Sequence, residues 1–139
     1  MLHGVLLDTG PLVAYFCPTE RHHDWAVRQF ASFASPVLTC EPVLTESCFL
    51  LARAGVPPAR VLAKLRQGAL RIGIAVDKEV DALVALMQRY ANLPMSLADA
   101  CMVRLAEIRP GPLCTLDGDF RVYRRNGRAP LELIVPANL

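Results

Sequence analysis

The stretch Val5-Leu6-Leu7-Asp8-Thr9-Gly10-Pro11 decides the fold of this chain. Three apolar residues run directly into a carboxylate, and a glycine and a proline follow at once. A short apolar run that ends in turn residues is typical of a buried strand in a parallel sheet. Pro11 suits the first turn of a helix, where its missing N–H group leaves no hydrogen bond unmade. Asp8 is therefore expected at the carboxyl end of a central strand, where open α/β sheets bind their ligands.

The composition indicates a single globular domain over residues 1–139, long enough to bury a substantial core. Hydrophobic residues make up 53% of the chain and the mean hydropathy is +0.32, so a second subunit or partner is expected to cover part of the apolar surface. No apolar run reaches the roughly 18–20 residues that cross a bilayer, and Asp8 interrupts the first apolar segment, so neither a membrane span nor a signal peptide is expected. The five cysteines are scattered without a C-x-x-C pair, which favours reduced core residues and a cytoplasmic location.

The net charge of +2 comes from fifteen basic and thirteen acidic residues. If four of the acids gather in one site, the rest of the molecule is clearly basic. Thirteen of the bases are arginine, which favours planar, bidentate contacts to phosphate or carboxylate. A general compositional bias toward arginine would explain the same counts, so charge alone does not identify a partner.

Strands and helices alternate along the chain. Further strands are expected at 36–39, 70–76, 113–116 and 131–135, and helices at 11–16, 22–34, 41–54, around 58–65, from 77 to about 91 and from 96 to about 109. In the helix that starts at residue 77, the apolar spacing predicts a core-facing stripe of Val80, Leu83, Val84 and Met87. The alternation predicts an α/β fold, with a mostly parallel five-stranded sheet covered by helices on both faces.

Two acids stand out on the expected helices. Glu46 comes three residues after Val43 and four before Leu50, which places it on the stripe that its helix is expected to bury. Alternatively, it lies at the edge of that stripe and reaches solvent. Asp99 follows Ser96 by three residues at the start of a helix, where S-x-x-D also resembles a capping box.

Asp117 and Asp119 follow the fourth expected strand, which repeats the pattern at Asp8. D-G-D is also ordinary turn chemistry. In a parallel sheet, Asp8 and Asp117 converge on one edge if their strands are neighbours, and Glu46 and Asp99 can close the ring. Oxygen ligands without histidine or cysteine favour a hard cation, Mg²⁺ or Mn²⁺. Such a site suits the cleavage of phosphodiesters.

Four stretches carry these acids in order: LLDTGPLVAYF at 6–16, VLTESCFLL at 43–51, MSLADACMV at 95–103 and TLDGDF at 115–120. Together they resemble the acidic motifs of PIN-domain ribonucleases, and the closest type is the small bacterial toxins of VapBC systems. The resemblance covers nearly the whole chain, and its specificity lies in the four ordered motifs. It implies a PIN-like three-layer α/β/α sandwich with the strand order 3-2-1-4-5.

The resemblance also implies the site residues. Asp8, Glu46 and Asp99 match the invariant acids of the family, and Asp117 matches the fourth. The spacing to the next acid varies in the family, so either Asp117 or Asp119 is expected to contact the metal directly. Three residues match hydroxyl positions that are expected to hold a carboxylate or a water: Thr9, Ser96 and Thr115.

The activity implied by the resemblance is metal-assisted hydrolysis of RNA. One or two divalent ions held by the acids would polarise the scissile phosphate and lower the pKa of an attacking water. No histidine nucleophile is required, and His3, His22 and His23 are expected at the surface. The implied partners are RNA, a small antitoxin protein and a second copy of the chain in a homodimer.

A basic segment with one aromatic residue follows the last acids. Basic residues interleaved with an aromatic suit phosphate contact and base stacking, so this segment is expected to bind RNA. A solvated loop is the alternative. The residues concerned are Arg121, Tyr123, Arg124, Arg125 and Arg128.

Other functions fit the sequence less well. The triplet Asp8-Thr9-Gly10 is also the signature of aspartic proteases, but those are all-β chains and this one carries long helical patterns. A phosphotransferase of the dehalogenase class would need an aspartate where this chain has Gly10. The remaining alternative is a PIN fold that binds RNA or protein without significant catalysis, and a nuclease assay with an Asp8→Asn control separates it from an enzyme.

Overall fold

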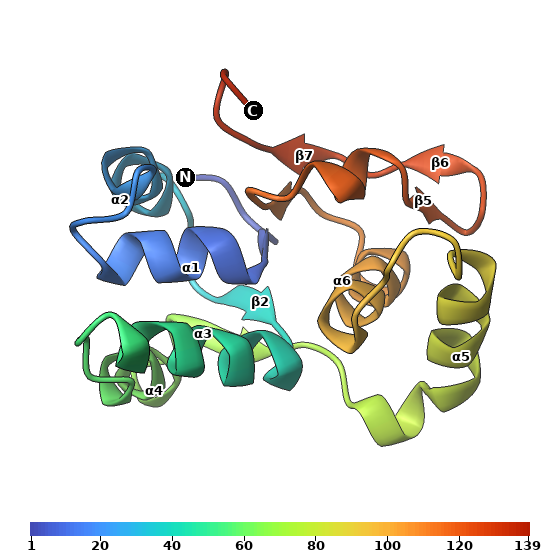
Figure 1. Cartoon of the computed structure of the whole chain (residues 1–139), viewed down its shortest axis with the longest axis horizontal. Coiled ribbons are helices and arrows are strands. Elements are labelled where there is room, and N and C mark those ends of the chain that lie inside the picture. Colours follow the sequence, from blue (N-terminus) through green and yellow to red (C-terminus); the bar gives the residue numbers. More distant parts are fainter.

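A five-stranded parallel sheet forms the centre of the fold, as described by a computed structural model of residues 1–139 (Figure 1). The strands are β1 (Leu6–Leu7), β2 (Val37–Thr39), β3 (Leu70–Ile72), β4 (Leu113–Cys114) and β7 (Leu133–Ile134). They lie in the order β3-β2-β1-β4-β7, and every neighbouring pair is parallel. The predicted sheet and its strand order are therefore confirmed.

The central strand β1 is buried on both faces, which explains its unbroken apolar sequence. Leu6 lies opposite Leu38 of β2 and Leu113 of β4, and Leu7 lies opposite Cys114. Val5 and both leucines of β1 have essentially no exposed surface. The carboxyl end of this strand is thus fixed by neighbours on either side, and Asp8 follows it directly.

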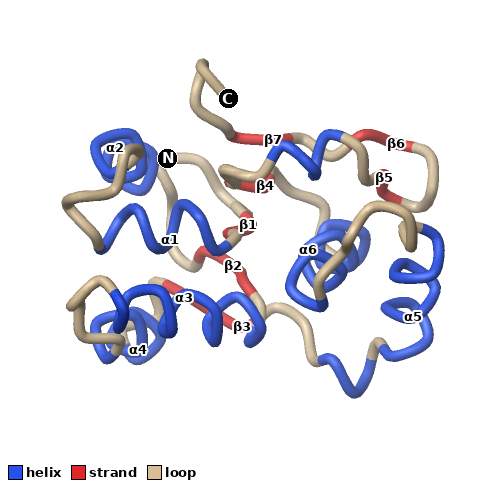
Figure 2. Tube along the Cα trace, viewed as in Figure 1, coloured by secondary structure: helices blue, strands red, loops and turns tan.

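Helices cover both faces of the sheet (Figure 2). On one side lie α1 (Thr9–Phe16), α2 (His23–Ala31), α3 (Glu41–Arg53) and α4 (Ala59–Arg66), and on the other lie α5 (Val80–Arg89) and α6 (Leu97–Ile108). Helix α6 packs directly on β1, and its buried positions include Cys101, Met102 and Leu105. None of the helices combines the length and the apolar character that a membrane span requires.

The predicted core stripe of α5 is mostly wrong. Leu83 and Leu86 are buried, but Val80, Val84 and Met87 are exposed, Val80 by 50%. The reason is that α5 packs on α6 and forms an outer layer, so only a narrow edge of it meets the rest of the chain. The spacing correctly predicts a helix but not which of its apolar edges is covered.

Several elements are shorter than the sequence pattern suggests. Strand β3 ends at Ile72, four residues before the predicted end, and a short 3-10 helix at Val76–Lys78 precedes α5. The predicted helix at 22–34 ends at Ala31, and the last strand covers only Leu133–Ile134. All five cysteines are free and four are buried, which confirms the prediction of core residues without disulfides.

The basic segment is not a solvated loop but forms regular structure. A 3-10 helix at Gly118–Arg121 leads into an antiparallel hairpin of β5 (Arg124–Arg125) and β6 (Ala129–Pro130). Asn126 and Gly127 in its turn both have positive φ angles, of 52° and 69°. An Asn-Gly pair is a common hairpin signal, so the sequence did contain a sign of this element.

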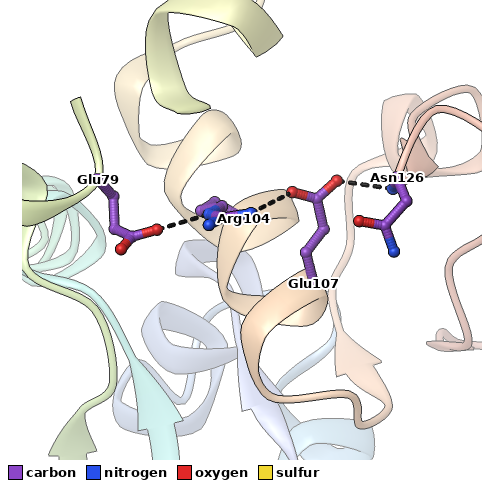
Figure 3. Close-up of polar contacts among 4 residues, drawn as sticks. All are labelled: Glu79, Arg104, Glu107 and Asn126. Atoms are coloured by element: carbon purple, nitrogen blue, oxygen red, sulfur yellow. Dashed lines mark hydrogen bonds and ion pairs between the residues drawn. The ribbon is translucent and has the colours of Figure 1, made fainter. Parts of the chain in front are cut away.

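A polar network attaches this hairpin to α6 (Figure 3). Arg104 of α6 donates from Nε to Glu79 Oε1 at 2.6 Å and from Nη1 to Glu107 Oε1 at 3.2 Å. The other oxygen of Glu107 accepts the backbone N–H of Asn126 at 2.7 Å. At the start of β5, the hydroxyl of Tyr90 accepts the backbone N–H of Arg124 at 2.9 Å.

Replacing Glu107 by alanine is expected to loosen the hairpin. The change removes a charged acceptor from the turn amide and a partner from Arg104, so the free energy of unfolding should fall by roughly 1–3 kcal/mol. Amide exchange at Asn126 should accelerate, while the amides of β1 keep their protection. The control Glu132→Ala, at an exposed carboxylate without a partner, should change stability by less than about 0.5 kcal/mol. An unchanged exchange rate at Asn126 would contradict this attachment.

Candidate active site

Four carboxylates surround one cleft at the carboxyl edge of the sheet. The cleft has a volume of about 530 Å³ and is open to solvent. Asp8 and Asp117 reach it from the ends of β1 and β4, and the two helices α3 and α6 supply the others. The acidic and hydroxyl residues that line it are Asp8, Thr9, Glu46, Ser96, Asp99 and Asp117. No lysine, arginine or histidine lines this cleft.

Asp8 is the most deeply buried of these acids, with 6% of its surface exposed. It ends β1 and precedes the first turn of α1, and its Oδ2 accepts a hydrogen bond from the Thr115 hydroxyl at 2.7 Å. Burial raises the pKa of Asp8 from 3.8 to about 6, and the charges of Asp99 and Asp117 act in the same direction. Hydrogen bonds from Thr115 and the Thr9 N–H oppose this rise in pKa but do not cancel it.

Thr115 links the two strand-end acids. Its buried hydroxyl donates to Asp8 and accepts the backbone N–H of Asp117 at 3.0 Å. Asp117 in turn accepts the N–H of Asp119 through Oδ1 at 2.9 Å, which starts the following 3-10 helix. One hydroxyl therefore fixes the position of Asp8 relative to the β4 end.

Asp99 is held at the start of α6 by the predicted capping box. Its N–H donates to Ser96 Oγ at 3.0 Å, and its Oδ2 accepts the N–H of Ser96 at 3.2 Å. The same oxygen lies 3.5 Å from the hydroxyl of Tyr123. Burial, together with the charges of Asp117 and Glu46, raises the pKa of Asp99 above its usual value. Asp99 therefore takes part in the helix cap and lines the cleft at the same time.

Glu46 lies at the cleft but is not buried, so its predicted place on the buried stripe is wrong. The buried face of α3 consists of Val43, Leu44, Ser47 and Leu51. Glu46 lies beside that face and lines the cleft. There, Thr9 Oγ1 donates a hydrogen bond to its Oε2 at 3.2 Å. The alternative of an edge position that reaches solvent is the one found.

Gly10 allows the close approach of the two strand ends. A Cβ atom at this position would lie 3.0 Å from the Cβ of Leu116, closer than ordinary side-chain contacts. The glycine lets the start of α1 pack against the segment after β4. The sequence pattern indicates only a turn residue at Gly10 and does not reveal this contact.

Comparison with known proteins gives the family. Residues 5–126 match the family described as PIN domain. The chain belongs to the PIN-domain family. Its relatives include Ribonuclease VapC26 of Mycobacterium tuberculosis, 29% identical over 116 residues, which cover 81% of this chain and 86% of the relative. The crystal structure of Mycobacterium tuberculosis VapC20, described as a sarcin-ricin loop cleaving toxin, superposes with a TM-score of 0.73 at 24% identity. That match covers 85% of this chain and 93% of VapC20, and it shows the shared fold.

The predicted site residues of this PIN-domain protein are not all in the cleft. Asp8, Glu46, Asp99 and Asp117 line it, whereas Asp119 does not. The three predicted hydroxyls all bond to these acids or their backbone: Thr9 to Glu46, Ser96 to Asp99, and Thr115 to Asp8 and Asp117.

The predicted stacking role of Tyr123 is wrong. Its ring has no exposed surface and packs edge to face on Phe120 and Tyr90, so no base can reach it. Its hydroxyl instead lies beneath Asp99, and burial among the acids raises the pKa of Tyr123. Alternation with arginine suggested an exposed residue, but the hairpin turns this side chain inward.

The arginines of the basic segment lie outside the cleft. Arg124 donates from Nη1 to the carbonyls of Arg121, Val122 and Tyr123, and Arg121 donates to the carbonyl of Leu139. Arg125 is half-buried and Arg128 is exposed. Contact of these four arginines with RNA stays a prediction.

The cleft has the chemistry of a site for a hard cation. Its donors are carboxylate and hydroxyl oxygens, no basic side chain compensates them, and the pKa values of Asp8 and Asp99 are raised in part by neighbouring carboxylates. As the side chains stand, no three form a group that encloses an ion directly. Mg²⁺ commonly binds through one or two carboxylates and keeps several waters, so the donor set fits it nonetheless.

The unusual pKa of Asp8 predicts how stability depends on pH without metal. As pH rises from 3.8 through about 6, the unfolded chain loses the Asp8 proton first, so the native state is progressively disfavoured. Asp8→Asn should therefore be more stable than wild type at pH 7.5 in EDTA, by on the order of 3 kcal/mol, with little difference at pH 4. Urea unfolding across this pH range measures it.

The control is Asp77→Asn, at an exposed aspartate outside the cleft. Its stability should follow that of the wild type at every pH. An Asp8→Asn variant that gains nothing between pH 4 and pH 7.5 would contradict the burial of an ionisable carboxyl at this position.

Proposed function

We propose that this protein is a metal-dependent endoribonuclease that hydrolyses RNA phosphodiester bonds in the acidic cleft. The observation that carries the proposal is the convergence of Asp8, Glu46, Asp99 and Asp117 from four separate elements on one cleft without a basic residue. The names of its relatives, a ribonuclease and a sarcin-ricin loop cleaving toxin, support the same activity.

The four acids of the cleft would hold the ion, Mg²⁺ or Mn²⁺. When bound, such an ion polarises the scissile phosphate and makes a bound water more acidic. Asp8 must be ionised to bind it, and its pKa of about 6 means that metal competes with a proton at this carboxyl below neutral pH. Asp117 rather than Asp119 is the fourth ligand, because only Asp117 lines the cleft.

The hydroxyl groups keep the carboxylates in position. The Thr115 hydroxyl donates to one oxygen of Asp8, the Ser96 hydroxyl accepts the backbone N–H of Asp99, and the Thr9 hydroxyl donates to one oxygen of Glu46. Asp8, Glu46 and Asp99 are therefore held in place before any ligand arrives. Such supporting contacts are typical of metal sites that must bind an ion and a phosphate in one defined arrangement.

We further propose that the ribonuclease is the toxin of a type II toxin–antitoxin pair in the cytoplasm, held inactive by a small antitoxin and assembled as a homodimer. Its VapC relatives support the toxin role. Free, mostly buried cysteines agree with a reducing compartment. Exposed apolar side chains on α3 and α5, such as Phe49, Val80 and Val84, are surface that a second subunit can cover.

Cleavage of structured RNA by the purified protein in Mn²⁺ tests the activity. Asp8→Asn and Asp99→Asn should lower the cleavage rate by at least about 10²-fold, because each removes a charge that holds the ion. Asp77→Asn should cleave at the wild-type rate, and EDTA should abolish cleavage. Full activity in either cleft variant, or cleavage in EDTA, would contradict the proposal. Binding of RNA without cleavage by the wild type would favour a binding module instead.

A further inference from the structure

A second pocket lies near the end of the sheet where β1 and β2 begin, away from the acidic cleft. Basic rather than acidic side chains line it. It has a volume of about 220 Å³, and the charged residues that line it are His3, Arg71 and Arg109. No aspartate or glutamate lines it. Asp99 and Arg109 lie ten residues apart along α6 and just beyond it, which corresponds to about 15 Å. The basic pocket is therefore separate from the acidic cleft.

The three basic residues come from distant parts of the sequence. His3 precedes β1, Arg71 is the middle residue of the edge strand β3, and Arg109 caps the end of α6. Arg71 lies opposite Leu38 in the sheet, and the Cβ position of Gly73 beside them meets Leu38 and Leu105 of α6. The register thus directs Arg71 to the sheet face that α6 covers, where Arg109 ends the helix.

Neither guanidinium has a partner within the chain. Arg104 is the one basic residue that forms ion pairs, and the arginines whose side chains donate hydrogen bonds are Arg104, Arg121 and Arg124. A charge on an edge strand limits pairing with other chains, and a cation suits a helix end. Each of these local reasons explains one arginine, but neither explains why Arg71 and Arg109 line the same pocket as His3.

We propose that this pocket, lined by His3, Arg71 and Arg109, binds a phosphate group. Guanidinium groups make bidentate hydrogen bonds to phosphate oxygens, and two unpaired ones beside an imidazole supply charge and donors without a competing carboxylate. The phosphate belongs to the RNA backbone away from the cleaved bond, an assignment that rests on the proposed function. The alternative ligand is a free phosphate ion or the phosphate of a small molecule, and the experiments below distinguish it from RNA.

A phosphate contact in the basic pocket would offset the repulsion between the acidic cleft and the RNA backbone. A cleft lined by four carboxylates repels the RNA backbone wherever it is not neutralised by a cation. Contacts to phosphates elsewhere on the surface supply affinity and position the strand without entering the cleft. The basic pocket provides such a contact on the same side of the sheet as α6, the helix that carries Asp99.

RNA binding is measured by fluorescence anisotropy with a labelled single-stranded RNA, in EDTA and in the Asp8→Asn background. No cleavage occurs under these conditions, so the result is independent of nuclease activity. Adding Arg71→Gln and Arg109→Gln should weaken binding roughly tenfold at 0.15 M salt and reduce the slope of log K against log salt by about 1.4, as the loss of two phosphate contacts requires. Arg60→Gln with Arg66→Gln, at two exposed arginines of α4, is the matched control and should leave the slope unchanged.

A second measurement identifies a free phosphate. Inorganic phosphate is titrated into the protein at constant ionic strength while the Nε–Hε signals of Arg71 and Arg109 are followed by NMR. Signals that shift with phosphate but not with chloride, together with a reduced salt slope in the double variant, support the RNA phosphate. Shifts without a change in slope support a pocket for a free phosphate. Unmoved signals and an unchanged slope, in a double variant that unfolds at the wild-type temperature, overturn the proposal even if the nuclease is active.

Discussion

The mutual repulsion of carboxylates at the edge of one sheet is the constraint on which the rest of this structure depends. Two such groups about 5 Å apart repel by about 3 kcal/mol at an effective dielectric constant of 20, and here four line a single cleft. Burial is the largest cause of the raised pKa values of Asp8 and Asp99, and the charges of the neighbouring carboxylates raise them further. A fold keeps such a cluster only where something offsets it, and a divalent cation offsets it most directly.

The rest of the molecule keeps those groups in place. A strand buried on both faces fixes Asp8, a helix cap fixes Asp99, and one threonine hydroxyl ties Asp8 to the end of β4. No basic residue lines the cleft; Arg124 and Arg125 lie in the hairpin, and His3, Arg71 and Arg109 line the separate basic pocket. This separation of charge agrees with the proposed function, in which the cleft binds a cation and basic groups elsewhere on the surface bind a polyanion.

The sequence predicts those features that depend on local chemistry. The apolar run before Asp8 indicates a buried strand because both faces of β1 are covered, and S-x-x-D indicates the cap of α6 because the bonds form within one turn. The strand order came from the family resemblance, since no periodic pattern specifies which strands are neighbours. The sequence pattern gives the wrong burial for Glu46, for Tyr123 and for the exposed edge of α5. Helical or alternating spacing does not reveal which neighbouring element covers a residue.

Anomalous diffraction from crystals soaked in Mn²⁺ tests the central claim most directly, because it locates the ion relative to the carboxylates. The account predicts one or two manganese peaks in the cleft, each within bonding distance of Asp8 or Asp99 directly or through water, and no peak there in Asp8→Asn crystals. A cleft without manganese at a concentration that saturates the protein in solution, or ions bound only elsewhere on the surface, would contradict it.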